Sequence, residues 1–167
     1  MNTHETPLGT LTLAASEHGL TRCTFRAAGE AATDPMPEAA RGWMDLARRE
    51  LDEYFAGRLR EFTVPVDLGK VPEARRRILD GLSEVGYGET VTYGRLASAL
   101  GLVEDGPRQV GAAMAGNPVL IVVPCHRVVG AGGKLVGYAG GLDAKRRLLE
   151  LEARDREPTL ELAFGSA

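Results

Sequence analysis

Residues 119–128 read Val-Leu-Ile-Val-Val-Pro-Cys-His-Arg-Val, an unbroken apolar run followed by a cysteine, a histidine and an arginine. A short continuous apolar run predicts a fully buried strand, here over 119–123, with Cys125 just past its end. A cationic or hydrogen-bonding neighbourhood lowers the pKa of a thiol, and the thiolate is the nucleophilic form. The stretch therefore predicts a reactive thiol at Cys125, with an inert core cysteine as the alternative.

The segments around this stretch are predicted to be mainly helical. Thr92 is suited to cap a short helix, and Pro107 is suited to the first turn of the next one. Two short helices joined by a glycine-containing turn predict a helix-turn-helix, although the turn over 101–106 is longer than usual. The expected elements are helices over 73–85, 93–100, from Pro107 to before Gly116, and 142–154, with a turn over 130–133.

The N-terminal part has a mixed pattern. Alternating apolar residues over 8–25, interrupted by Gly19, predict a β-hairpin. Helical spacing over 38–55 predicts an amphipathic helix, and 62–68 returns to a strand-like pattern. We therefore expect an α+β fold in which a small N-terminal α/β lobe packs on a mainly helical, winged-helix-like C-terminal domain. The expected units are 1–69, 70–157 and a tail over 158–167.

Size and charge limit the classes of function. A chain of 167 residues is long enough for one domain or two small lobes. No apolar run approaches the length of a membrane span and no leader pattern is present, so we expect a cytoplasmic protein with reduced thiols. The net charge is −3, yet Lys and Arg outnumber Asp and Glu by 11 to 7 over 70–147. This local excess permits contact with a nucleic acid without demonstrating it.

Several motifs in the C-terminal part resemble those of the O6-alkylguanine-DNA alkyltransferases. The active-site signature of that family is present without a change, and the flanking blocks keep the order of the family and nearly its spacing. The resemblance runs closely over 71–152 and loosely through the N-terminal lobe. The matching blocks are Pro124-Cys125-His126-Arg127-Val128, Gly137-Tyr138-Ala139-Gly140-Gly141 with Lys145 and Leu148-Leu149, Gly88 to Tyr93, Arg108 to Gly111, and Gly116-Asn117-Pro118.

The resemblance implies roles for individual residues. Cys125 would accept the alkyl group irreversibly, once per molecule, and His126 with Glu152 would take its proton through a water. Asn117 would tie the turn of the site, and Tyr93 would donate to the leaving guanine oxygen. The implied pocket residues are Val128, Tyr138, Ala139 and Gly140.

The resemblance also implies double-stranded DNA with O6-alkylguanine as the partner. The target nucleotide would be rotated out of the stack into the pocket. The small-residue helix that begins near Arg108 would lie in the minor groove, where an arginine replaces the extruded base. The implied DNA-contacting residues are Arg108, Gly111, Ala112, Ala115 and Arg127. We expect a monomer, with clustering along DNA left open, and no contact with a membrane.

No cofactor and no metal are expected. His4, His18 and Cys23 match no recognised zinc spacing, and a fourth ligand is unclear. Two other functions stay open at this point. One is a non-catalytic module that recognises the same lesions, although such proteins lack the acceptor cysteine. The other is a cysteine hydrolase that uses Cys125, His126 and Glu152 on a small acyl substrate, although no oxyanion-hole motif is evident.

Overall fold

The N-terminal lobe is built on a three-stranded antiparallel sheet. The computed structural model describes residues 2–25 and 36–164, with side chains through residue 154. Strands β2 (Gly9–Ser16) and β3 (Gly19–Phe25) form the predicted hairpin. Strand β1 (Thr3–Thr6), which was not predicted, pairs with the other edge of β2 and gives the order β1-β2-β3.

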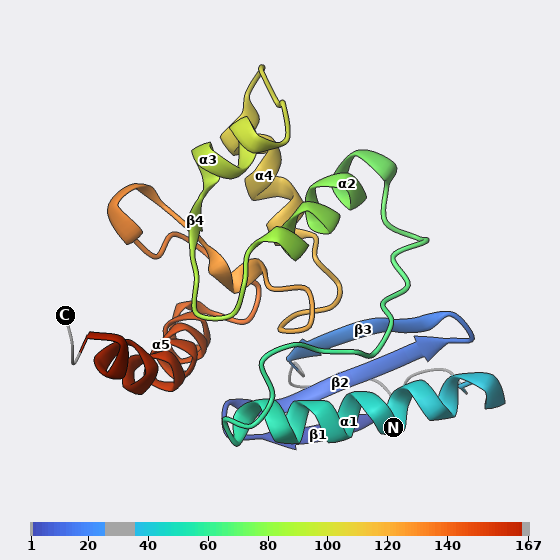
Figure 1. The fold of residues 1–167 in the computed structure, drawn as a ribbon. Helices are drawn as coiled ribbons and strands as arrows, with labels where there is room; N and C mark the ends of the chain where they lie inside the picture. The colour runs from blue at the N-terminus through green and yellow to red at the C-terminus, as the bar shows by residue number, and fades with distance from the viewer. Residues whose placement is uncertain (1, 26–35, 165–167) are drawn as a thin grey trace.

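Helix α1 (Arg41–Phe55) covers one face of this sheet (Figure 1) and follows a 3-10 turn over Glu38–Ala40. The predicted amphipathic pattern is confirmed, because the apolar stripe of α1 is buried while its other face is exposed. The stripe packs against the inward-facing residues Leu11 and Leu13, which are fully buried. The buried residues of α1 are Met44, Ala47, Glu50, Leu51 and Tyr54.

The predicted strand over 62–68 is wrong. This segment meets the sheet through an isolated bridge between Val66 and Leu20 and through a hydrogen bond from the Ser16 hydroxyl to Asp67. Its backbone instead bonds to the buried carboxylate of Glu50, which accepts from the Thr63 amide at 2.9 Å, the Thr63 hydroxyl at 2.6 Å and the Val64 amide at 2.9 Å. A buried side chain therefore satisfies donors that a sheet ladder would otherwise satisfy.

The C-terminal lobe begins with α2 (Glu73–Gly81), which continues as a 3-10 turn over Leu82–Glu84. After the short strand β4 (Val91–Thr92) come α3 (Tyr93–Ala99) and α4 (Gly106–Ala115). The hydroxyl of Thr92 accepts from the Arg95 amide at 3.1 Å, so its predicted role as an N-cap is confirmed. The two helices pack on each other as the predicted helix-turn-helix (Figure 1).

The predicted strand over 119–123 is also wrong, although the burial of the run is confirmed. The segment forms a turn in which Ile121 has a φ of 73°, a value that no strand allows. A single bridge joins Val119 to Cys23 of the N-terminal sheet. The turn leads into a 3-10 helix, η3 (Cys125–Arg127), and then into β5 (Val128–Val129), which pairs in parallel with β4.

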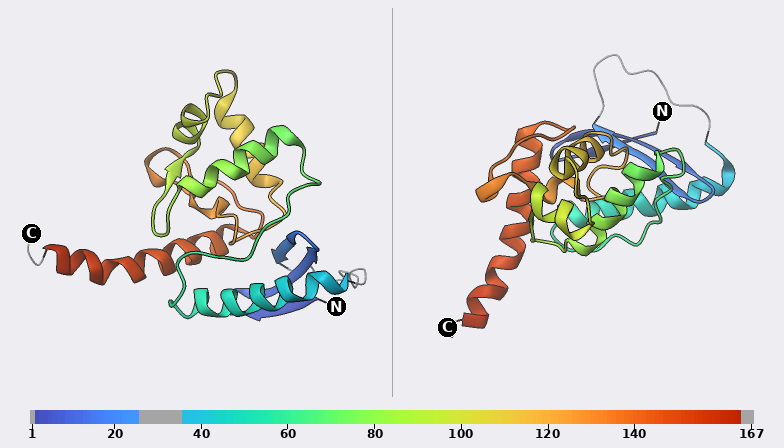
Figure 2. Two further views of the ribbon diagram at one scale, coloured as in Figure 1. Left: turned by 45° about the vertical axis from the view of Figure 1, so that its right-hand side comes forward. Right: turned by 90° about the horizontal axis from the view of Figure 1, so that it is seen from above.

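The chain ends in the long helix α5 (Leu142–Phe164), after a 3-10 turn over Ala131–Gly133. The first half of α5 lies against the body, and its C-terminal half extends away from it (Figure 2). The helix therefore continues past residue 154, where the prediction ended it. Within residues 2–25 and 36–164, no helix combines the length and apolar character needed to span a bilayer. The expected fold class, a small sheet lobe packed on a mainly helical domain with a helix-turn-helix, is confirmed.

We predict that Glu50→Ala lowers the free energy of unfolding by about 3 kcal/mol, because it leaves the part-buried amide of Thr63 and the buried amide of Val64 without an acceptor. Urea denaturation measures this difference. Glu53→Ala on the same helix is the matched control, since Glu53 is 40% exposed and pairs with exposed Arg58. That variant should lose less than about 1 kcal/mol. Equal losses in the two variants would contradict the role given to Glu50.

Candidate active site

Cys125 is buried yet opens onto a cavity. Its side chain is 2% exposed and lines a cavity of about 690 Å³ between α3, α4 and the loop over 136–139. Burial raises the pKa of the thiol to about 11, while a hydrogen bond with Asn117 and the charge of Lys145 oppose this shift. The expectation that neighbouring cations depress this pKa is therefore wrong for the resting protein, because desolvation is the larger effect. At neutral pH the group is a thiol.

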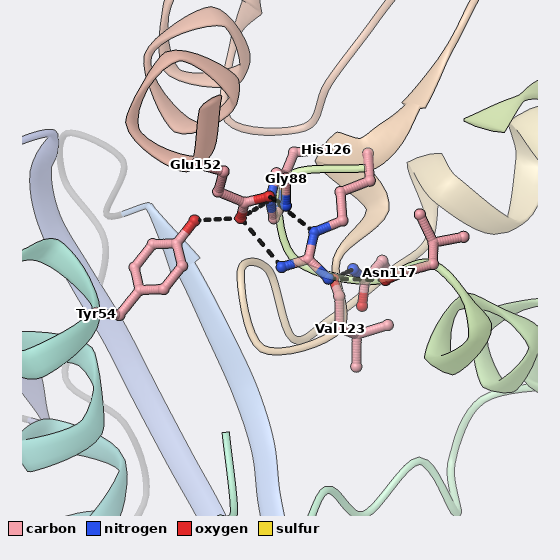
Figure 3. A network of polar contacts seen from close by, with 8 residues as sticks. Tyr54, Gly88, Asn117, Val123, His126 and Glu152 are labelled. Atoms are coloured by element: carbon pink, nitrogen blue, oxygen red, sulfur yellow. Dashed lines mark hydrogen bonds and ion pairs between the residues drawn. The ribbon is translucent and has the colours of Figure 1, made fainter. Parts of the chain in front are cut away.

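His126 follows Cys125 in the chain and is fully buried. Its Nε2 lies 2.8 Å from Oε2 of Glu152 (Figure 3). A carboxylate only accepts, so Nε2 carries the hydrogen, and Nδ1 of the neutral ring is left as the acceptor. Nδ1 is buried with no hydrogen-bond partner among the described residues. Burial lowers the pKa of His126 and outweighs the opposing influence of Glu152, so the ring is a neutral base.

Glu152 is the buried anion of the site, and its carboxylate accepts hydrogen bonds from three segments of the chain (Figure 3). Its Oε2 accepts from the Tyr54 hydroxyl at 2.6 Å as well as from His126. Arg127 donates to both oxygens, at 2.9 and 3.1 Å, and the Gly88 amide donates at 3.2 Å. Burial alone would raise the pKa of Glu152, but the hydrogen bonds from His126 and Arg127 and the charge of Arg127 outweigh it and lower the pKa to about 2.

Arg127 does not lie on a DNA-facing surface. It is 7% exposed, and its guanidinium is engaged by Glu152, by the Val85 carbonyl at 2.8 Å and by the ring of Tyr87 at 5.9 Å. A sequence places an arginine next to a reactive group without showing which way its long side chain points. The expectation that Arg127 contacts DNA is therefore wrong. The residue instead neutralises the buried carboxylate of Glu152.

Asn117 braces the turn that presents the thiol. Its Nδ2 donates to the Val123 carbonyl at 3.0 Å, and its Oδ1 accepts from the Val119 amide at 2.9 Å. These two bonds close the turn over 119–123 from inside, where both backbone groups are buried. The side chain therefore lies at the turn that holds Cys125, which is the position that the family resemblance implies.

Lys145 was not assigned a role from the sequence, although it belongs to one of the matching blocks. Its side chain is fully buried on α5. The ammonium donates to the Val128 carbonyl at 2.7 Å and the Gly137 carbonyl at 2.9 Å, and lies 5.9 Å from the centre of the Tyr93 ring. It thus fixes the loop that forms one cavity wall and places a positive charge near Cys125, whose pKa it lowers.

Of the nine residues predicted for catalysis or the pocket, four line the cavity: Tyr93, Cys125, Tyr138 and Ala139. Burial raises the pKa of Tyr93, so its phenol remains protonated. Val128 is fully buried on β5 and does not line the cavity. Gly140 lies behind the wall, where an added Cβ would meet the rings of Phe25 and Tyr138 within 3 Å.

Helix α4 forms the opposite wall. Arg108, Gly111 and Ala115 line the cavity, and Ala112 is exposed on the same helix. A Cβ added at Gly111 would meet nothing within 4 Å, so this face is open. Across the described part of the chain, His, Cys, Asp and Glu side chains nowhere gather in a group of three or more that could hold a metal ion.

Together, the fold and the site define a two-lobed protein whose buried cysteine, supported by a histidine and a carboxylate, opens beside a helix-turn-helix. Two family models match the chain. The 6-O-methylguanine DNA methyltransferase, DNA binding domain matches residues 73–154, and the 6-O-methylguanine DNA methyltransferase, ribonuclease-like domain matches residues 1–68. The chain belongs to the 6-O-methylguanine DNA methyltransferase family, and its enzyme class is methylated-DNA–protein-cysteine methyltransferase.

Relatives and solved structures agree with this membership. The methylated-DNA–protein-cysteine methyltransferase of Mycolicibacterium paratuberculosis is 42% identical over 167 residues, 96% of each chain. That of Methanosarcina acetivorans is 40% identical over 154 residues, 89% of this chain and 94% of the relative. The crystal structure of Mycobacterium tuberculosis OGT in complex with DNA is 42% identical and superposes with a TM-score of 0.79 over 92% of each chain. The O6-methylguanine DNA methyltransferase of Methanococcus jannaschii is 30% identical, with a TM-score of 0.61 over 90% of this chain and 92% of that one.

The depressed pKa of Glu152 predicts a specific loss of stability in acid. A carboxyl with a folded pKa of about 2 and an ordinary value of 4.5 contributes stability above pH 4.5 and loses it as the pH falls toward 2. We expect the wild type to lose about 3 kcal/mol in that window and Glu152→Gln to lose much less. Denaturant unfolding at stepped pH measures the curves, with the exposed Glu150→Gln as control. Parallel curves for wild type and Glu152→Gln would contradict the prediction.

Proposed function

We propose that the protein repairs alkylated DNA by moving an alkyl group from O6 of guanine onto Sγ of its own Cys125. A bond forms between sulfur and the alkyl carbon, and the bond between that carbon and O6 breaks. The observation that carries the proposal is the position of Cys125, which is buried on the wall of a cavity of about 690 Å³ and is followed in the chain by a buried, neutral His126. A cavity of this size is typical of small-molecule and base-binding pockets.

His126 takes the proton of the thiol in this proposal. Its Nδ1 is the acceptor of the ring and has no hydrogen-bond partner among the described residues. A bridging water would connect this atom to the sulfur. Glu152 holds the ring in this tautomer and stabilises the imidazolium that forms. Because the pKa of the resting thiol is about 11, the proton leaves when the substrate is in place and not before.

Tyr93 donates a proton or hydrogen bond to the departing guanine oxygen. Guanine is a poor leaving group as an anion, so a donor is needed where negative charge develops. The raised pKa of Tyr93 keeps its phenol protonated at neutral pH, and the residue lines the same cavity as Cys125. The hydroxyl of Tyr138, buried with no partner in the described part of the chain, is available to the bound base.

DNA binds along α4 in this proposal, and the damaged nucleotide leaves the stack to reach the cavity. The exposed side chains of α4 are small apart from Arg108 and Gln109, so the helix backbone can approach a narrow groove. Arg108 lies at the rim of the cavity, where it can fill the space left by the extruded base. Gly111, Ala112 and Ala115 form the face that approaches the groove.

Incubation with an O6-methylguanine oligonucleotide tests the transfer. We expect mass spectrometry to show one added methyl group on Cys125 and the reaction to stop after one equivalent, because the thioether has no route back to a thiol. Cys125→Ser should gain no methyl. Tight binding of the modified DNA without any mass change would favour a non-catalytic recognition module. Repeated turnover of an ester or amide would favour a cysteine hydrolase.

Gly111→Leu tests the close approach of α4 to DNA. The site has open space for a Cβ and the helix gains a better helix former, so thermal stability should not fall. Affinity for duplex DNA should drop by about tenfold, since the larger side chain holds the helix away from the groove. Gly42→Leu on α1, where a Cβ also meets nothing, is the control for added bulk. Unchanged affinity in the Gly111 variant, measured by fluorescence anisotropy, would refute this docking face.

A further inference from the structure

A tyrosine of the N-terminal lobe reaches into the catalytic network. Tyr54 lies on the buried face of α1, and its hydroxyl donates to Oε2 of Glu152 at 2.6 Å, across 98 positions of sequence (Figure 3). Both side chains are fully buried. The other donors to Glu152 are His126, Arg127 and the Gly88 amide, which all belong to the C-terminal lobe. The N-terminal lobe thus supplies one direct contact to the carboxylate that orients the base.

The ring of Tyr54 is held by aromatic neighbours from both lobes. Phe55 and Tyr87 pack edge-on against it at 5.3 and 6.2 Å between ring centres, and Phe62 lies at 5.4 Å. A ring fixed on several sides has one position for its hydroxyl. A buried tyrosine hydroxyl normally has a partner, and here that partner is the carboxylate that holds His126.

The hydroxyl also acts on the electrostatics of the site. Oε2 accepts hydrogen bonds from Tyr54, His126 and Arg127. Because the three donors share one oxygen, each of them weakens the electrostatic attraction between that oxygen and the other two. The charged and titratable groups that act on this centre come from five segments of the chain. They are Arg127 and His126 from η3, Lys145 from α5, Tyr54 from α1, Tyr87 from the loop before β4 and Tyr138 from the loop before α5. Of these, Tyr54 is a neutral donor whose hydroxyl can be deleted while its ring stays in place.

We propose that Tyr54 is a positioning residue for alkyl transfer, which fixes Glu152 and limits the basicity of the pair formed by Glu152 and His126. This inference rests on the proposed function, in which neutral His126 takes the proton of Cys125. The role is indirect, since Tyr54 acts through the carboxylate and does not line the cavity.

Deletion of the hydroxyl has an effect of known sign. In Tyr54→Phe, Oε2 loses one neutral donor and its charge is less dispersed, so the imidazolium form of His126 is better stabilised. The pKa of His126 therefore rises in the variant, and the neutral base is lost at a higher pH. The acid limb of the pH profile of methyl transfer should move up by about one unit, which makes the reaction about tenfold slower on that limb.

The experiment compares wild type, Tyr54→Phe and Phe62→Leu in single-turnover methyl transfer from an O6-methylguanine oligonucleotide over a range of pH. Phe62→Leu disturbs the packing of the same ring without touching Glu152, so it should lower thermal stability and leave the acid limb in place. A shifted limb in Tyr54→Phe alone supports the proposal. An unshifted limb in Tyr54→Phe, or an equal shift in both variants, overturns it.

A second measurement separates this inference from the proposed function. The chain has three histidines, so NMR titration can follow His126 without DNA. A higher pKa of His126 in Tyr54→Phe than in wild type supports the electrostatic role even if methyl transfer is not observed. An unchanged pKa overturns that role even if wild-type protein transfers the methyl group. Cys125→Ser tests the transfer itself and leaves the Tyr54 contact intact.

Discussion

The buried negative charge of Glu152 constrains both lobes. An unpaired carboxylate in a protein interior costs several kcal/mol, so its position requires donors on every open side. Those donors come from η3, from the loop at Gly88 and from α1. The N-terminal lobe therefore does more than cover the C-terminal lobe, because its helix α1 supplies one of the hydrogen-bond donors that surround the carboxylate on α5. The same contacts that satisfy the charge set the orientation of His126.

Burial explains how the thiol of Cys125 can be protected at rest and still react in the proposed function. Desolvation raises the pKa of Cys125, so the resting sulfur is a poor nucleophile toward solutes that reach the cavity. Reactivity then depends on the neighbouring base, on the charge of Lys145 and on a substrate that fills the cavity beside them. In such a site the rate enhancement comes from groups that are held in fixed positions, and a permanently ionised sulfur is not required.

The sequence predicted those elements whose residues carry their own periodicity or caps. The hairpin, α1, α2 and the Thr92 cap belong to this group. The two false strands show the limit, because an apolar run predicts burial without fixing the backbone conformation. At 119–123 the side chain of Asn117 closes a turn, and at 62–68 the carboxylate of Glu50 captures the amides. Each case depends on a polar side chain outside the run. A local sequence pattern does not show which backbone groups such a side chain will bind.

The same limit applies within the site. The motif around Cys125 pointed to a thiol and a histidine that are adjacent in sequence, and both are buried. It misplaced Arg127, whose partner lies on α5. Helical periodicity placed Tyr54 in the apolar stripe of α1, and its burial is what that pattern predicts. A buried tyrosine, however, carries a hydroxyl that must be satisfied, and this requirement is readable in the sequence even though the partner is not. Polar atoms within apolar stripes thus mark the positions where a distant segment must approach, and here that segment holds the buried carboxylate of Glu152.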